Sequence, residues 1–172
     1  MSAHDKTGVG HGSAEWRTPP ELFARLNRRF LFDYDAFASH DNALCDLYST
    51  VDGTFRKVGN SPYQERLYTI ADEGDGLTFN WQNLRVWLNP PYSRGLIDQC
   101  VEKAYEERNN AAIIVALLPA ATETRWFQRW ILPYCHVDWL PKRVRYIDPV
   151  TLKPGGSPPS GSVVATFKAD LI

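Results

Sequence analysis

The stretch Leu84-Arg85-Val86-Trp87-Leu88-Asn89-Pro90-Pro91-Tyr92 decides the fold of this chain. Its first five residues are mostly apolar and predict a short buried strand. A rigid turn follows, because Pro90 and Pro91 each have a fixed φ and lack a backbone N–H. A helical pattern begins just after this turn, at Ser93. A strand, a stiff turn and a helix in this order hold the Asn89 amide and an aromatic ring still at the rim of a parallel sheet.

The rest of the chain alternates between predicted strands and helices, which is typical of an α/β fold with three layers. Strands are predicted over residues 30–37, 81–88, 111–118, 135–140 and 162–167. Helices are predicted from residue 20 to about residue 30, over residues 95–108 and over residues 122–132. The apolar run 111–118 is typical of a parallel strand covered on both faces. Residues 38–66 show little periodicity and predict a long irregular segment.

The first helix has a strong start signal, Thr18-Pro19-Pro20-Glu21. Thr18 is the expected N-cap, and Glu21 stands three residues later, as in a capping box. Proline fits the first turn of a helix, where its missing N–H costs nothing.

The composition is that of an ordinary globular protein. The chain has 172 residues, 44% of them hydrophobic, and a formal net charge of −1. We expect a flexible tail over residues 1–14, with solvated His4 and His11, and a single domain over residues 15–172. The sequence has no apolar run of about 18 residues and no signal-peptide pattern, so we expect a cytoplasmic protein without a membrane partner.

Three cysteines, Cys45, Cys100 and Cys135, are widely spaced and form no CxxC pair. No histidine stands at metal-ligand spacing to them. We therefore expect reduced, mostly buried thiols and no metal site.

The Asn89–Tyr92 turn suits methyl transfer to the nitrogen of a planar amine or amide. Such a nitrogen is a poor nucleophile, because its lone pair is delocalised. Two acceptors, the Asn89 side-chain oxygen and the Pro90 carbonyl, would hold its two protons and free the lone pair. Tyr92 offers a flat face for stacking, worth ~1–3 kcal/mol on the base-stacking scale. The alternative is a plain turn, since Asn-Pro-Pro is favourable turn chemistry by itself.

Five pieces of the chain, taken in order, resemble the phage-type DNA N6-adenine methyltransferases of the Dam family. The resemblance covers about residues 15–168 and includes the four-residue turn as an Asn/Asp-Pro-Pro-Tyr motif. The pieces are Trp16-Arg17-Thr18-Pro19, residues 32–38 with Asn42-Ala43, residues 86–93, residues 117–120 with 124–127, and residues 159–164.

This resemblance implies a Rossmann-like, three-layer core with a mixed, mostly parallel sheet, and S-adenosylmethionine as methyl donor. It implies that Asn89, Pro90, Pro91 and Tyr92 are the catalytic residues. The cofactor-binding residues that it implies are Trp16, Thr18, Pro19, Asp35, Ala36 and Asn89. For Trp16, Thr18 and Asp35 the alternatives are a core position, a helix cap and a structural pair. The loop over residues 35–40 departs from many methyltransferases, because it has no glycine; there we expect Phe37 in the core and His40 at the surface.

The implied partner is double-stranded DNA, from which such an enzyme flips the target adenine out of the stack. The candidate phosphate contacts are Arg125, Arg129, Lys142, Arg143 and Arg145;. The alternative for each is a solvated surface charge. Residues 147–161 form either a target-reading loop or a long connection. Two other functions remain open, a protein glutamine methyltransferase and a non-catalytic DNA-binding relative.

Overall fold

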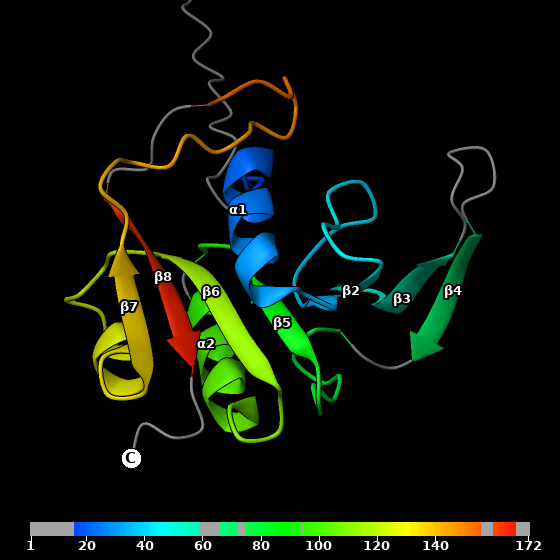
Figure 1. The fold of residues 1–172 in the computed structure, drawn as a ribbon, viewed down its shortest axis with the longest axis horizontal. Coiled ribbons are helices and arrows are strands. Elements are labelled where there is room, and N and C mark those ends of the chain that lie inside the picture. The colour runs from blue at the N-terminus through cyan, green and yellow to red at the C-terminus, as the bar shows by residue number, and fades with distance from the viewer. Residues whose placement is uncertain (1–15, 59–65, 72–74, 94, 156–159, 168–172) are drawn as a thin grey trace, which may run out of the picture.

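The computed structural model describes residues 16–58, 66–71, 75–93, 95–155 and 160–167. The expected N-terminal tail, residues 1–14, lies outside the described residues, as does part of the 147–161 segment. One eight-stranded sheet runs through the described part in the order β4-β3-β2-β1-β5-β6-β8-β7 (Figure 1). Its strands are β1 (Tyr34–Asp35), β2 (Leu47–Thr50), β3 (Gly53–Val58), β4 (Arg66–Ala71), β5 (Arg85–Leu88), β6 (Ile113–Pro119), β7 (Cys135–Trp139) and β8 (Ser162–Phe167). The helical elements are α1 (Pro20–Phe30), α2 (Leu96–Glu107) and the short π-helix η2 (Phe127–Ile131).

The sheet is mixed, as predicted. The four central strands β2, β1, β5 and β6 pair in parallel. The other pairings are antiparallel: β2 with β3, β3 with β4, β6 with β8, and β8 with β7. Parallel pairing is therefore confined to the middle of the sheet, which is less parallel than predicted.

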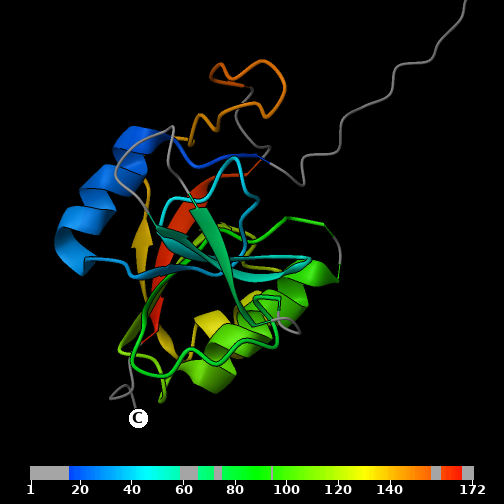
Figure 2. The ribbon, with the colours of Figure 1, turned by 90° about the vertical axis from the view of Figure 1, so that its right-hand side faces the viewer.

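Hydrophobic side chains cover both faces of the sheet. Alternate residues of a strand point to opposite faces, so Val86 and Leu88 of β5 join the cluster that contains α2, whereas Trp87 joins the cluster that contains α1. Figure 2 shows α1 and α2 on opposite sides of the strands. The predicted apolar run of β6 divides in the same way and is buried from Ile114 to Leu118.

The start of α1 differs from the prediction. The N-cap position is Pro19, no side chain caps the helix, and Thr18 is buried with its hydroxyl turned elsewhere. At the other end the helix runs through Phe30, and Leu31 closes it in the left-handed conformation with φ of 53°. The strand predicted over residues 30–37 is therefore only Tyr34–Asp35.

The prediction of an irregular segment over residues 38–66 is wrong. It contains β2 and β3, and β4 begins at its end. Their polar residues concealed the pattern, because Ser49 and Thr54 are buried and bond to each other, with their oxygens 2.6 Å apart. The helix predicted over residues 122–132 is also shorter, and its regular part is η2.

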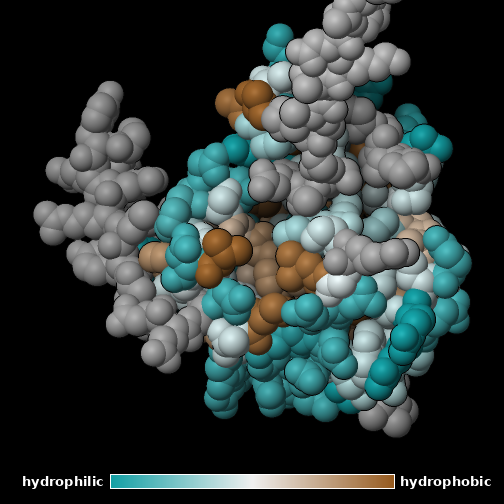
Figure 3. Space-filling model, turned by 180° about the vertical axis from the view of Figure 1, so that it is seen from behind, coloured by the Kyte–Doolittle hydropathy of each residue, from teal (hydrophilic) through white to brown (hydrophobic). Residues whose placement is uncertain are grey.

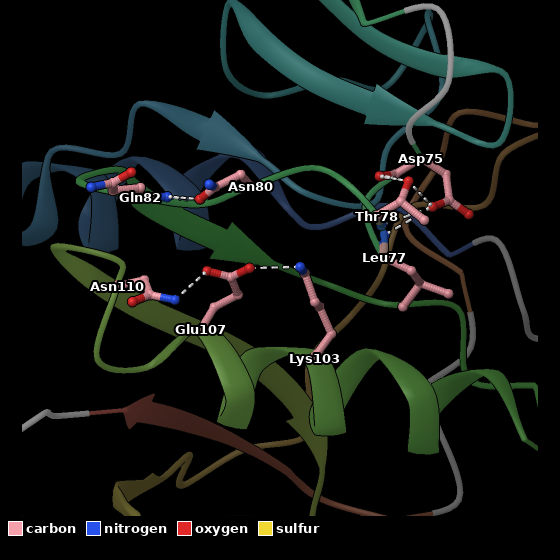
Figure 4. Close-up of polar contacts among 8 residues, drawn as sticks. All are labelled: Asp75, Leu77, Thr78, Asn80, Gln82, Lys103, Glu107 and Asn110. Atoms are coloured by element: carbon pink, nitrogen blue, oxygen red, sulfur yellow. Dashed lines mark hydrogen bonds and ion pairs between the residues drawn. The ribbon is translucent and has the colours of Figure 1, made fainter.

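Polar contacts fix both ends of the segment that carries β5 and α2 (Figure 4). The carboxylate of Asp75 accepts the backbone N–H groups of Leu77 and Thr78 at 3.1 and 3.2 Å, which turns the chain toward β5. Near the end of α2, Lys103 forms an ion pair with the buried Glu107 at 2.6 Å. No helix among the described residues is long and apolar enough to cross a bilayer.

The thiols of the buried Cys45 and Cys100 and of the half-buried Cys135 give a first prediction. Burial raises the pKa of all three cysteines, that of Cys100 to about 12. Because the thiolate is the reactive form, we expect native protein at pH 8 to react with an aromatic disulfide reagent at least ~100-fold more slowly than urea-unfolded protein. Rapid modification of one thiol in the native protein would contradict this.

Candidate active site

The carboxyl ends of the central parallel strands bring the predicted site residues together. β1 and β5 are neighbours, with Asp35 opposite Trp87, so Asp35 and Asn89 emerge side by side at one edge of the sheet. Open α/β sheets bind ligands outside this edge. A cavity of about 1100 Å³ lies there and is lined by both residues. Figure 3, which views the molecule from behind, shows apolar side chains gathered around a hollow in a largely hydrophilic face.

The Asn89 side chain has a defined orientation. Its Nδ2 donates to the Thr18 hydroxyl at 3.1 Å and, more weakly, to the backbone carbonyl of Trp16 at 3.4 Å. Its Oδ1 accepts a hydrogen bond from the Tyr92 hydroxyl, with the two oxygens 3.1 Å apart. A carboxamide oxygen has two lone pairs, so Oδ1 retains capacity for one more donor.

Tyr92 is anchored through its hydroxyl. That hydroxyl lies 2.7 Å from the Tyr146 hydroxyl and also 3.3 Å from the Leu117 carbonyl. Tyr146 is buried in turn and lies 3.3 Å from the Ser162 hydroxyl. Burial raises the pKa of Tyr92 and of Tyr146, so both phenols stay protonated at neutral pH. The rest of Tyr92 is only partly buried.

The cavity wall is rich in carboxylates. Asp35, Asp41, Asp52 and Asp75 line it. Asp41 accepts a hydrogen bond from Ser39 and pairs with Arg17, and these contacts lower the pKa of its carboxyl group. Asp35 is buried and its Oδ2 accepts the Leu44 backbone N–H at 3.0 Å. The cavity therefore suits a ligand that carries positive charge.

A glycine does approach the loop after β1, but from a distant part of the sequence. Gly76 lines the cavity, and a Cβ there would lie 1.9 Å from the Ala36 carbonyl oxygen and 2.8 Å from the Phe37 ring. Gly76 therefore provides the close backbone approach at this loop, although residues 35–40 contain no glycine. Sequence spacing gave no signal for Gly76 or for Tyr146, because their contacts depend on the sheet register.

The predicted cofactor residues divide into two groups. Trp16, Thr18, Asp35 and Asn89 line the cavity, whereas Pro19 and the fully buried Ala36 do not. The helix-cap alternative for Thr18 is wrong, because α1 has no side-chain cap. Trp16 both packs against the core cluster on the α1 side and lines the cavity.

Within the predicted catalytic turn, Asn89 and Pro91 line the cavity, while Pro90 is buried and Tyr92 is bonded to Asn89 without lining the cavity. Phe37 packs on the core, as expected, and also lines the cavity. His40 is exposed, as expected, and its Nδ1 lies 2.8 Å from the Tyr48 hydroxyl.

The predicted basic residues are all exposed and none lines the cavity. Arg143 and Arg145 alternate with the buried Val144 and Tyr146, so both point outward from this segment, which is not part of a strand. Arg129 places its guanidinium 4.3 Å from the centre of the Trp130 ring.

Two comparisons with known proteins identify the family of this chain. The family model for DNA N-6-adenine-methyltransferase (Dam) matches residues 54–170. A DNA N-6-adenine-methyltransferase of Escherichia phage T1 is 37% identical over 127 residues. That match covers 73% of this chain and 44% of the phage protein, so the chain aligns with less than half of its relative.

The chain therefore belongs to the DNA N-6-adenine-methyltransferase (Dam) family. The resemblance found in the sequence is confirmed. The mixed α/β sheet with its cavity at the carboxyl ends of parallel strands is consistent with a methyltransferase-like fold.

Proposed function

We propose that this chain transfers a methyl group from S-adenosylmethionine to the N6 amine of adenine in double-stranded DNA. The observation that carries the proposal is the defined orientation of Asn89, which lines a cavity large enough for a cofactor and a base and whose side-chain oxygen has capacity for a second donor;. Family membership supports the same reaction. We infer a Rossmann-like, three-layer core from the central parallel strands and from helices on both faces;.

The cavity residues fit S-adenosylmethionine. This donor carries a sulfonium and an ammonium group, and the four lining aspartates favour such charges;. Asp35 and Trp16 would hold it, and Gly76, which has no side chain, would let the wall of the cavity come close to it. When bound, the donor supplies an electrophilic methyl group and leaves as a neutral thioether.

The turn activates the amine. The Asn89 Oδ1 and the Pro90 carbonyl each accept one N6 proton, which draws the nitrogen toward a tetrahedral shape and frees its lone pair. The freed lone pair would then be directed at the methyl group of a bound donor. The extra N6 proton then leaves to solvent. Neither Tyr92 nor Tyr146 serves as the base, because burial raises the pKa of both phenols.

Tyr92 does not line the cavity itself, but its ring is partly exposed and would be available to the flipped base, with its hydroxyl held by Asn89 and Tyr146. Such a ring face binds adenine by stacking. The Asn89 turn by itself also fits a glutamine side-chain amide, but the family match and the exposed basic residues favour DNA.

The segment over residues 141–147 would contact the DNA phosphates. It follows β7 and leads to Ile147, which lines the cavity. Exposed Lys142, Arg143 and Arg145 would therefore lie along the path of a duplex whose flipped base enters the site;.

We expect the double variant Arg143→Ala/Arg145→Ala to weaken DNA binding. The slope of log K against the logarithm of the salt concentration should become shallower by about two. Affinity for S-adenosylmethionine should not change. The matched pair Arg125→Ala/Arg129→Ala should have the smaller effect, because Arg129 is stacked on Trp130. Fluorescence anisotropy of labelled duplex across a salt series measures the DNA affinity and its salt dependence for both double variants. A larger loss in the second pair would reject the 141–147 segment as the main contact.

The proposed function is tested by incubating the protein with methyl-labelled S-adenosylmethionine and a mixture of duplex DNA and protein acceptor. We expect the label in DNA. Label in protein alone would favour the glutamine reaction. Binding of the duplex without binding of the donor would favour a non-catalytic DNA-binding protein.

A further inference from the structure

The buried hydroxyl of Thr18 has no role in its own helix. α1 begins at Pro20, its N-cap position is Pro19, and no side chain caps it. Thr18 is nevertheless only 6% exposed. A buried hydroxyl is normally hydrogen-bonded, and the hydrogen bond at Thr18 runs to Asn89 Nδ2, 71 residues further along the chain.

The segment that carries Thr18 is fixed in place independently of Asn89. Arg17 and Ile147 exchange two backbone hydrogen bonds of 3.0 and 2.9 Å. The Arg17 side chain also bonds to Asp41. On the other side of Trp16, a Cβ at Gly155 would overlap the indole ring, so that this loop closely supports the ring.

These contacts decide which end of the Asn89 carboxamide carries the nitrogen and which carries the oxygen. The Trp16 carbonyl can only accept a hydrogen bond, so the group that faces it must be the NH₂;. Thr18 takes a second proton of the same NH₂. A flipped carboxamide would place oxygen against the Trp16 carbonyl and present two N–H groups to the substrate amine, which is itself a donor.

We infer that Thr18 is a positioning residue that acts with the Trp16 carbonyl to hold the Asn89 oxygen toward the substrate amine. This inference rests on the proposed function for its catalytic consequence. It assigns to Thr18 a role different from direct contact with the cofactor, because its hydroxyl is directed at Asn89. The Trp-Arg-Thr-Pro and Asn-Pro-Pro-Tyr segments lie far apart in the sequence, and these hydrogen bonds join them in the fold.

Two variants of Thr18 separate this role from a structural one. Valine has the shape of threonine without the hydroxyl, and serine keeps the hydroxyl. We expect Thr18→Val to lower the single-turnover rate of methyl transfer to DNA about tenfold, the loss of one hydrogen bond. Its dissociation constant for S-adenosylmethionine, measured by calorimetry, should change less than twofold. Thr18→Ser should restore most of the rate.

A variant of Asn89 tests the polarity directly. Aspartate occurs at this place in the family motif, yet a carboxylate has no N–H for the Trp16 carbonyl. We therefore expect Asn89→Asp to transfer methyl groups at least ~10-fold more slowly than the parent protein, because an unpaired carbonyl–carboxylate contact is unfavourable. Parental rates in Asn89→Asp would overturn the inference.

A readout without catalysis completes the test. In nuclear magnetic resonance spectra of the full chain, the side-chain NH₂ protons of Asn89 should exchange slowly with solvent. Thr18→Val should accelerate this exchange severalfold, while the exchange rates of the backbone amides of α1 should stay unchanged. Unchanged exchange in Thr18→Val would overturn the inference, as would weaker donor binding at an unchanged rate. If the parent protein shows the protected NH₂ but transfers no methyl group to DNA, the proposed function fails and the orientation of Asn89 stands.

Discussion

Replacing Asn89 with alanine is expected to lower turnover on DNA at least ~100-fold, the loss typical of one preorganised hydrogen bond that acts in the transition state. The side chain bonds to Trp16, Thr18 and Tyr92, but it is only partly buried. We therefore expect the thermal midpoint to fall by only a few degrees, since about 1 kcal/mol corresponds to roughly 2–4 °C in a chain of this size.

The matched control is Asn109→Ala, which removes an exposed asparagine in the turn after α2, remote from the cavity lining. It should leave turnover and thermal midpoint unchanged. Single-turnover rates on duplex DNA, with circular dichroism melting of each variant, provide the comparison. Parental turnover in a folded Asn89→Ala protein would remove the mechanism proposed for the turn.

The second large effect is expected at Gly76. An added Cβ would lie 1.9 Å from the Ala36 carbonyl oxygen, a backbone atom at the end of β1. Because neither backbone can yield without moving the cavity wall, we expect Gly76→Ala to cost at least the ~1–3 kcal/mol of ordinary overpacking. The thermal midpoint should then fall by roughly 5 °C or more, and the affinity for S-adenosylmethionine by at least tenfold.

Gly161→Ala is the control for this substitution, because the nearest atom to its Cβ would be the Ala120 Cβ at a comfortable 3.9 Å. It adds the same methyl group at the same edge of the sheet and should be tolerated. Calorimetric titration with S-adenosylmethionine and thermal melting measure both variants. Equal behaviour of Gly76→Ala and Gly161→Ala would show that the approach of Gly76 to Ala36 does not shape the site.

The sequence revealed the elements that have a clear apolar pattern. β6, β8 and α2 fall within two residues of their predicted bounds, because their buried faces are formed mainly by aliphatic residues in regular spacing. β7 also lies within one residue of its predicted bounds, although none of its residues is fully buried. β2 and β3 escaped detection because buried Ser49, Thr50 and Thr54 are polar and satisfy one another or the backbone within the fold.

The candidate site was predictable where local chemistry identifies a residue by itself. Asp35 ends β1 and Asn89 directly follows β5, and adjacent parallel strands bring such ends together;. The partners of Asn89 were not predictable in the same way. Thr18 looked like a helix cap, and its true contact depends on how α1 packs against β5, which no local pattern encodes. Tyr146 and Gly76 likewise acquire their roles only through contacts across the sheet edge.

The central claim is that the Asn89–Tyr92 turn directs a methyl group to an exocyclic amine of DNA. Mass spectrometry of the nucleosides released from duplex DNA, after incubation with methyl-labelled S-adenosylmethionine, measures this product directly. We predict labelled N6-methyl-2′-deoxyadenosine with the parent protein and almost none with Asn89→Ala. Label confined to cytosine, or absent from DNA and found on protein glutamine, would contradict the account.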